Sequence, residues 1–348
     1  MPPSHGLNRR IRLTLQCSKD PTMAYAPDIR PGLRVTSATA TRELVLFFAI
    51  LVVGAGFSFA SPYFLTPLNL TQTLRAGLEL AIVSSGMTLV IIMGGIDVSV
   101  GGIVAVSSIV IGKSYQAGVP AWIVAPIGLF TGSLLGACNG ILTTKLKVPP
   151  IIATLGSMYI FSAIMFIVIG GAWIAGLPGT LSPLVNGNVF LIPSAVLIIL
   201  FVYGVCWILL RRLAFGRHLY AIGCNEQSAR LSGINVDRTK ITTYMILGLL
   251  AGFAAVLYVA RMRNVEINIG TTVALEAIAA TVLGGTNIRG GVGSLLGTLL
   301  GVAFIRMIQN GLVLIGVSSL WETVIIGGLL IVVLTADAVG SRNNPRAH

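Results

Sequence analysis

Long apolar runs separated by short polar segments dominate this chain, and their lengths predict helices that cross a membrane. A spanning helix needs about 20 mostly apolar residues. Helices are expected because lipid cannot hydrogen-bond an open backbone, and the runs are too continuous for barrel strands. The runs lie near residues 44–61, 74–93, 101–117, 121–143, 150–170, 189–210, 241–260, 273–285, 294–313 and 321–336. We therefore predict an all-α polytopic membrane protein with about ten transmembrane helices, two of them short (273–285 and 321–336).

Composition supports this class. Of the 348 residues, 55% are apolar and 10% charged, whereas about 25% of an ordinary soluble domain is charged. The net charge of +12 would suit a nucleic acid, but the charges lie between apolar runs rather than in one patch. We therefore expect membrane lipid and no nucleic acid as a partner. The predicted divisions are a flexible cytoplasmic tail over 1–43, a transmembrane domain over 44–336, and a cytoplasmic tail over 337–348.

One long polar segment, residues 211–240, interrupts the apolar runs with six Lys/Arg and two acidic residues. Loops rich in Lys/Arg stay in the cytoplasm. With the N-terminus inside, alternating spans place most of the 23 basic residues on the cytoplasmic side. The opposite side receives Arg75, Lys113, Arg261 and Arg263. The pattern predicts an N-in, C-in orientation with a cytoplasmic 211–240 loop.

Two glycine-interrupted segments predict an internal repeat. Residues 78–102 read LELAIVSSGMTLVIIMGGIDVSVGG, and residues 275–293 read LEAIAATVLGGTNIRGGVG. Each runs from Leu-Glu to Gly-Gly, then through a polar insert to a second Gly-Gly. In transporters, such paired segments point to the substrate path, because irregular backbone at membrane depth lines cavities. The span count puts both inserts on one side, so either the repeat is parallel or one segment is re-entrant.

Polar side chains in these segments are the candidates for a substrate pathway. An ionisable group inside a membrane costs roughly a few kcal/mol or more unless it is paired or hydrated. Asp97 has an equally good structural interpretation, because it can cap the N-terminus of a half-helix. Glu79 and Glu276 lie at predicted span starts, where a carboxylate can reach interfacial water. The candidates are Asp97, Ser99, Glu79, Glu276, Thr286 and Asn287.

No pattern of an enzyme accompanies these candidates. Residues 112–114 read Gly-Lys-Ser, but Ser107 stands where a P-loop needs glycine. The three histidines, His5, His218 and His348, do not have the spacing of a catalytic triad or a His-Glu-x-x-His site. The cysteines lack CxxC or metal-ligand spacing. We expect no catalytic residue, no metal and no cofactor.

Four stretches resemble the ribose/xylose-type permease family, the membrane subunits of bacterial ABC importers and more distant relatives of the branched-chain amino acid permeases. They are GGIDVSVGGIVAVSS at 94–108, PPIIATLGSMYIFSAI at 149–164, GRHLYAIGCNEQSARLSGINVDRTK at 216–240 and LEAIAATVLGGTNIRGGVGSLLGTLLG at 275–301. The resemblance covers about residues 44–336. It implies a multi-pass protein of the bacterial inner membrane that pairs with an identical or different permease subunit. It also implies cytoplasmic ATPase subunits that hydrolyse ATP, and a periplasmic binding protein that delivers a sugar.

The resemblance further implies that residues 225–233 supply a short coupling helix to the ATPase. The residues themselves agree, because Asn225 is a good N-cap, Glu226 suits the positive helix start, and Gly233 can end the turn. Ala229 and Leu231 are expected as apolar contacts. The alternative is an ordinary solvated loop. The implied coupling residues are Asn225, Glu226, Ala229, Arg230, Leu231 and Gly233.

Other functions remain open from the sequence. An ABC permease of this kind can serve a branched-chain amino acid, a nucleoside or an autoinducer-like sugar. A secondary sugar or ion-coupled transporter would use Asp97 or Glu79 for coupling and need no ATPase. A channel or structural membrane protein would not pump in one direction. The polar residues are too scattered along the sequence to identify the substrate.

Overall fold

The computed structural model describes residues 37–318 together with 321, 324, 325, 327, 328, 331 and 335. The predicted C-terminal tail, most of the predicted N-terminal tail and most of the predicted run 321–336 lie outside these residues. The first helix, α1, begins at Ser37. Residues 37–43, which were predicted to end the tail, therefore belong to a helix that continues into the first apolar run.

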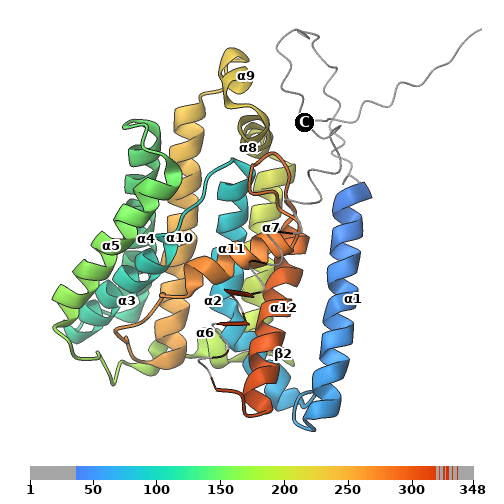
Figure 1. Ribbon diagram of the computed structural model, residues 1–348. Coiled ribbons are helices and arrows are strands. Elements are labelled where there is room, and N and C mark those ends of the chain that lie inside the picture. Colours follow the sequence, from blue (N-terminus) through green and yellow to red (C-terminus); the bar gives the residue numbers. More distant parts are fainter. Residues whose placement is uncertain are drawn as a thin grey trace, which may run out of the picture.

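Helices form nearly all of the described chain (Figure 1). In order they are α1 (Ser37–Ala60), α2 (Pro67–Ile92), α3 (Val100–Gln116), α4 (Ala121–Thr144), α5 (Pro150–Ile169), η1 (Gly179–Leu181), α6 (Pro183–Asn186), α7 (Ser194–Arg211), α8 (Ala214–Cys224), α9 (Glu226–Leu231), α10 (Val236–Met262), α11 (Val273–Leu283) and α12 (Leu295–Leu314). Among the described residues, seven helices are long and apolar enough to cross a membrane: α1, α2, α4, α5, α7, α10 and α12. The prediction of a mostly helical, multi-spanning protein is thus confirmed.

The centre of the bundle is formed by α2 and α10, whose side chains are largely buried. In contrast, α1 stands at the periphery beside α12, with most of its apolar side chains exposed (Figure 1). An isolated apolar helix is stable in lipid because its backbone is satisfied internally. The exposed apolar surface therefore fits a lipid environment.

Glycines bring α4 and α10 into backbone contact. Gly132 and Gly136 on α4 face Gly248 and Gly252 on α10, and a Cβ added at Gly132 would overlap the Gly248 carbonyl oxygen. Small residues at four-residue spacing allow this approach, and close packing drives helix association where lipid offers no hydrophobic gain. The two helices consequently form one closely packed pair.

The two repeated segments place their inserts together. The first insert, residues 93–99, joins α2 to α3, and the second, residues 284–294, joins α11 to α12. Gly291 donates its backbone N–H to the Ile92 carbonyl oxygen over 2.8 Å. Both inserts therefore lie at one end of the bundle, as predicted. The short helix α11 lies across the bundle rather than along it (Figure 1).

A short hairpin precedes α7 and shortens the span predicted for 189–210. Its antiparallel strands are β1 (Asn188–Val189) and β2 (Ile192–Pro193), and α7 begins at Ser194. The predicted start was wrong because the hairpin side chains are as apolar as the helix that follows. Pro193, which has no backbone N–H to donate, is the residue just before the first residue of the helix.

Candidate functional site

The first insert is fastened by Asp97, whose side chain is completely buried. Its Oδ1 accepts hydrogen bonds from the Ser99 backbone N–H at 2.8 Å and from the Ser99 hydroxyl at 2.6 Å. The Asn139 amide on α4 donates to Asp97 Oδ2 at 3.2 Å and to Ser99 Oγ at 2.6 Å. A buried carboxylate needs such donors because desolvation opposes its charge. Asp97 thus satisfies the backbone before α3 and ties the insert to α4.

Two further helices hold the same insert. Thr154 on α5 accepts a hydrogen bond from the Val98 backbone N–H at 3.2 Å. Tyr244 on α10 lies against Gly95, where an added Cβ would approach the phenol oxygen to 2.9 Å. We name the set Asp97, Ser99, Asn139, Thr154 and Tyr244 the Asp97 cluster. The cluster connects the insert to α4, α5 and α10 at once.

Both glutamates of the repeated Leu-Glu pairs are buried and form ion pairs. Glu79 Oε1 lies 2.8 Å from Nε of Arg261, and Glu276 Oε2 lies 3.0 Å from a guanidinium nitrogen of Arg306. Gln309 accepts from Arg306 at 2.6 Å and donates to Glu276 at 3.4 Å. The pairing supplies the compensation that an intramembrane charge requires.

The expectation that these carboxylates lie at span starts, near interfacial water, was wrong for Glu79. Helix α2 begins at Pro67, well before the predicted start at residue 74, because Thr66 caps it by accepting from the Asn69 backbone N–H. Glu79 therefore lies midway along α2. Glu276 does lie in the first turn of α11, but its side chain is buried against α12.

The second insert is held mainly by its own backbone. Asn287 Oδ1 accepts from the Arg289 N–H at 2.9 Å, and the Asn287 N–H donates to the Val292 carbonyl at 3.0 Å. Thr286 is buried. At the far end of the insert, Ser294 donates to a carboxylate oxygen of Glu43 on α1. The structure thus brings Asp97 and Ser99 together, while Asn287 makes its bonds within its own turn.

The polar segment 211–240 folds as α8 and α9 between α7 and α10, and α9 projects at the upper end of the molecule (Figure 1). Asn225 Oδ1 accepts from the Ser228 backbone N–H at 2.9 Å, so Asn225 caps α9. Gly233 adopts φ +81°, a conformation that favours glycine and ends the turn. The cap and the stop predicted for this helix are confirmed.

Helix α9 turns one apolar side chain inward and one outward. Leu231 is 84% exposed, whereas Ala229 is 4% exposed and packs in the core. The expectation that both residues face a partner therefore fails for Ala229, because the helix lies with that side against the rest of the chain. Leu231 is the apolar side chain that α9 presents.

Ion pairs attach α9 to its neighbours. Lys240 lies 2.6 Å from Glu226, and Arg230 lies 2.6 Å from Asp237 and 3.3 Å from Glu226. Lys145, which follows α4, lies 3.6 Å from Asp237. Each exposed pair contributes at most about 1 kcal/mol. We call these five residues the α9 charge network, and its main effect is to set the orientation of α9 on α10.

The charge of Glu226 is favoured in this network. Partial burial raises the pKa of the carboxyl, but hydrogen bonds and attraction from Lys240 and Arg230 outweigh burial. The pKa of Glu226 therefore lies below its ordinary value. Glu226 is consequently ionised at neutral pH and can keep both partners.

Helix α8 touches both repeated inserts. A Cβ added at Gly223 would overlap the Ile92 carbonyl oxygen and would lie 2.5 Å from the Gly291 nitrogen. A Cβ at Gly290 would lie 3.0 Å from Cα of both Gly223 and Gly94. We name this contact of α8 with the two inserts the glycine junction. Through it, the segment that carries α9 is in direct backbone contact with the repeat.

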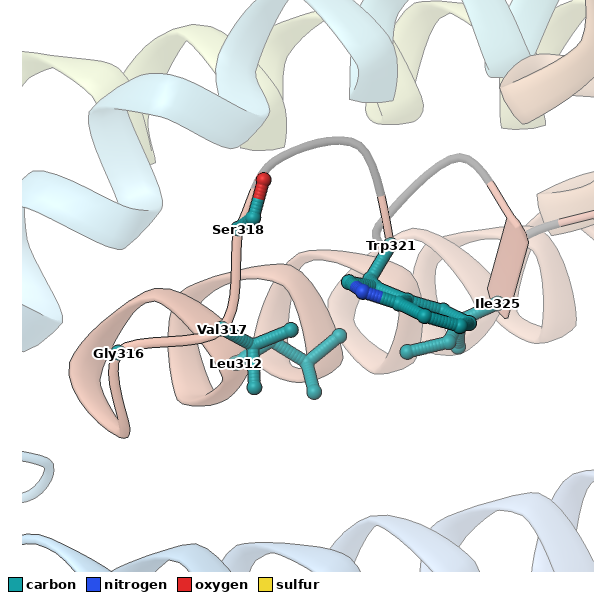
Figure 2. A pocket seen from close by; sticks show the side chains of 6 residues that line it. All are labelled: Leu312, Gly316, Val317, Ser318, Trp321 and Ile325. Atoms are coloured by element: carbon teal, nitrogen blue, oxygen red, sulfur yellow. The ribbon is translucent and has the colours of Figure 1, made fainter.

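A shallow apolar pocket lies past the end of α12 (Figure 2). None of the residues predicted for the substrate pathway lines it. Its Ser318 hydroxyl and Trp321 ring are the groups that interrupt an otherwise aliphatic lining. The lining residues are Leu312, Gly316, Val317, Ser318, Trp321 and Ile325. The pocket therefore offers little for recognising a polar substrate.

Sequence reasoning missed most of the contacts that hold the candidates. Tyr244 and Thr154 read as ordinary members of apolar runs, and Asn139 is one of the polar residues that lie too scattered along the sequence to be placed in one site. The basic pattern placed Arg261 on the side with few basic residues, but it did not identify Arg261 and Arg306 as the partners of Glu79 and Glu276. Each of these pairs joins different helices, so no local spacing reveals it.

The chain resembles known permeases. A family model described as "Branched-chain amino acid transport system / permease component" matches residues 69–334. The ribose import permease protein RbsC of Bacillus subtilis is 38% identical over 84% of this chain and 91% of that protein. RbsC of Escherichia coli K12 is 36% identical over 88% of this chain and 97% of its own. The autoinducer 2 import system permease protein LsrC of Escherichia coli O157:H7 is 34% identical over 85% and 86%, respectively. No solved structure matches significantly.

Proposed function

We propose that this chain, which belongs to the family of branched-chain amino acid transport system permease components, is the membrane-spanning permease subunit of an ABC importer. The proposed cargo is a ribose-like sugar, since relatives in Bacillus subtilis and Escherichia coli are named for ribose import. The relative named for autoinducer 2 import makes an autoinducer-like sugar the second candidate. The chain is a multi-pass protein of the bacterial inner membrane. These relationships do not favour a secondary transporter.

The proposed topology is N-in, C-in with about ten spans. The seven long helices, the shorter α3 and the run 321–336 supply nine of these, and the tenth predicted run is the short helix α11, which lies across the bundle (Figure 1). The proposed membrane domain covers 44–336, extended at its start by the first residues of α1, with cytoplasmic tails on either side. The 211–240 segment faces the cytoplasm as the coupling segment, which its six Lys/Arg support.

The proposed partners follow from this role. Cytoplasmic ATPase subunits hydrolyse the ATP, a second permease subunit of the same or another kind completes the membrane pore, and a periplasmic binding protein delivers the sugar. The chain itself performs no catalysis. Its work is conformational, because it converts a movement imposed in the cytoplasm into a change of access across the membrane.

The glycine junction is the observation that carries the coupling proposal. We propose that α9, with Leu231 exposed, contacts the ATPase together with Asn225, Glu226, Arg230 and Gly233. A displacement of α9 would pass along two routes. The α9 charge network leads to α10, while α8 leads through Gly223 to both inserts. Backbone contact transmits displacement well because it leaves no side chain free to yield.

We propose that the substrate path follows the two inserts. In this conformation the Asp97 cluster holds the first insert closed against α4, α5 and α10. Opening the path requires Asp97 and Ser99 to exchange their bonds with Asn139 for bonds to water or to sugar hydroxyls. Thr286 and Asn287 have the corresponding place in the second insert. Glu79 and Glu276 then hold α2 and α11 in position through their arginines.

Reconstitution tests the function. The chain is placed in vesicles with its ATPase subunits and binding protein, and uptake of radiolabelled ribose is measured with and without ATP. We expect uptake only when ATP is present on the cytoplasmic side and the binding protein on the other. Uptake driven by a proton gradient without the ATPase would contradict the proposal. Binding of an autoinducer-like sugar instead of ribose by the delivery protein would redirect the cargo.

A double variant tests the coupling segment. Replacing Glu226 by Gln and Gly233 by Ala together should reduce co-purification of the ATPase and abolish its stimulation by substrate. The matched control is Glu266→Gln with Gly176→Ala, which changes another carboxylate and another left-handed glycine, φ +70°, in other loops. An unaffected complex in the folded Glu226/Gly233 variant would remove α9 from the ATPase contact.

A further inference from the structure

The hairpin of β1 and β2 presents an apolar tip at the end of α7 that lies opposite the charged segment (Figure 1). Phe190 is 96% exposed and Leu191 is 97% exposed. Val189 and Ile192 on either side are about half exposed. Four consecutive apolar side chains therefore stand on a turn that the rest of the described chain does not cover.

The connection that carries this tip has no charged residue of its own, and a charged residue beside the hairpin is Arg75 on α2, which donates to the Asn186 carbonyl oxygen at 2.9 Å. No Asp, Glu, Lys, Arg or His occurs in the connection between α5 and α7, residues 170–193. A water-exposed stretch of that length would ordinarily include many charged residues, because about a quarter of the residues in a soluble domain are charged. Trp173, in the same connection between α5 and α7, is also exposed. A segment without charged side chains that exposes a tryptophan is typical of the membrane–water interface.

The turn itself is unusual. Phe190 adopts φ +57°, in the left-handed region that favours glycine and that bulky side chains rarely occupy. The strained backbone is held between paired residues, because Val189 is paired with Ile192. Strain of this kind persists where the surrounding structure imposes it, and it points to a role for the side chain that is displayed.

The length of α7 places the tip at a membrane boundary. Its 18 residues span about 27 Å, close to the roughly 30 Å of the hydrocarbon core. Arg211 ends the helix, and the Arg212 guanidinium lies 5.7 Å from the centre of the Trp207 ring, a pairing suited to one interface. Ser194 therefore lies near the other interface. Each hairpin strand has two residues and so extends only about 7 Å from it.

We propose that this hairpin is a lipid-binding anchor. Phe190 and Leu191 enter the boundary between headgroups and acyl chains at the end of α7, about 5–10 Å deep, as apolar interfacial segments do. Lipid fits better than a soluble protein, because the segment itself supplies no charged residue for the polar, charged rim of an interface that forms and dissociates. Arg75, which bonds to Asn186 beside the hairpin, suits the level of the headgroups. The exposed apolar side of α7, including Leu200 and Phe201, continues the same surface into the bilayer. The anchor holds one end of α7 while α8 follows its other end, whatever the chain transports.

Photo-crosslinking identifies what touches the tip. Phe190 is replaced by benzoylphenylalanine in the full chain, in vesicles of phosphatidylethanolamine and phosphatidylglycerol and in its own bacterial membrane. We expect lipid adducts by mass spectrometry after irradiation. The matched control replaces Leu231 on α9, which is 84% exposed, by the same analogue. A covalent dimer, an adduct with a soluble protein, no adduct, or equal lipid labelling at Leu231 would each overturn the proposal.

Depth-dependent quenching gives an independent result. Phe190→Trp is made in a chain whose four native tryptophans are replaced by Phe, and bromine is placed at different depths in the lipid. We expect strongest quenching by bromine just below the headgroups, and weak quenching by acrylamide in the water. Quenching by acrylamide alone would overturn the anchor. Leu231→Trp should show that water-exposed pattern.

Discussion

The two copies of the repeat begin from the same sequence pattern but are held in different ways. The first insert is fastened inside the bundle by a fully buried carboxylate that bonds to Ser99 and Asn139. The second insert is held by its own turn, by the Ser294 bond to Glu43 on α1, and by contact with α8. The comparison teaches that, although α8 touches both copies, the first is also fastened to the core helices by a buried carboxylate, whereas the second relies on its own turn and on a bond to the peripheral helix α1.

The largest expected effect concerns the buried glutamate–arginine ion pair that both copies of the repeat contain. Glu79→Ala removes the carboxylate that pairs with Arg261, and Glu276→Ala removes the one that pairs with Arg306, which keeps its bond to Gln309. Breaking a buried pair costs about 3–5 kcal/mol. Because both arginines retain some access to water, we expect the lower end of this range. Denaturant titration of the purified chain measures the loss of stability. The paired change Glu79→Leu with Arg261→Leu should recover much of it, and failure to do so would mean that the charge itself is needed.

The next largest effect is a difference in the loss of stability between variants of the first and the second insert. Asp97→Ala removes the buried acceptor of the Ser99 backbone N–H, of the Ser99 hydroxyl and of one Asn139 bond, which we expect to cost about 2–3 kcal/mol. Asn287→Ala removes one turn-forming bond near the surface, which should cost about 1 kcal/mol. The same titration compares both variants. Equal losses would contradict the view that the first insert is the anchored one.

Transport should distinguish anchoring from gating in the first insert. Asp97→Asn keeps the shape of the side chain but removes its charge, so the complex with the ATPase should still assemble. We expect sugar uptake to fall roughly tenfold, which corresponds to about 1.4 kcal/mol. Normal uptake would remove Asp97 from the path.

A smaller change at the glycine junction tests the link from α8 to the inserts. Gly223→Ala places a methyl group against the Ile92 carbonyl and must separate α8 from the first repeat. We expect uptake to fall several-fold, while ATP turnover becomes independent of the binding protein. The control is Gly204→Ala on α7, where an added Cβ meets nothing within 4 Å. Unchanged coupling in Gly223→Ala would exclude this route.

The smallest expected effect concerns the α9 charge network. Glu226→Gln removes exposed ion pairs with Lys240 and Arg230, so stability should change by less than about 1 kcal/mol. The pKa of Glu226 is lowered in the folded chain, so its contribution is complete above the ordinary glutamate pKa and is lost as the pH falls through the lowered value. ATPase co-purification measured across acidic pH should therefore weaken only well below neutrality. The variant should lose this pH dependence.

Local signals predicted much of the fold because they act within a turn or two of helix. The positions of most spans, the Asn225 cap and the Gly233 stop all follow from neighbours close in sequence. The span at 189–210 was misplaced because a hairpin of Val, Phe, Leu and Ile has the same hydropathy as a helix. The side of α9 that turns inward, with Ala229, depended on where α10 lies.

By itself, the sequence determined that this protein is a helical membrane protein, that it contains a glycine-interrupted repeat, and which end of α7 is charged. Only the tertiary structure decided the partners of the buried charges. Asp97 meets Asn139, and Glu79 meets Arg261, across gaps of 42 and 182 residues. Hydropathy and capping depend on neighbours a few residues apart, whereas these pairs form only when packed helices bring distant side chains within bonding distance.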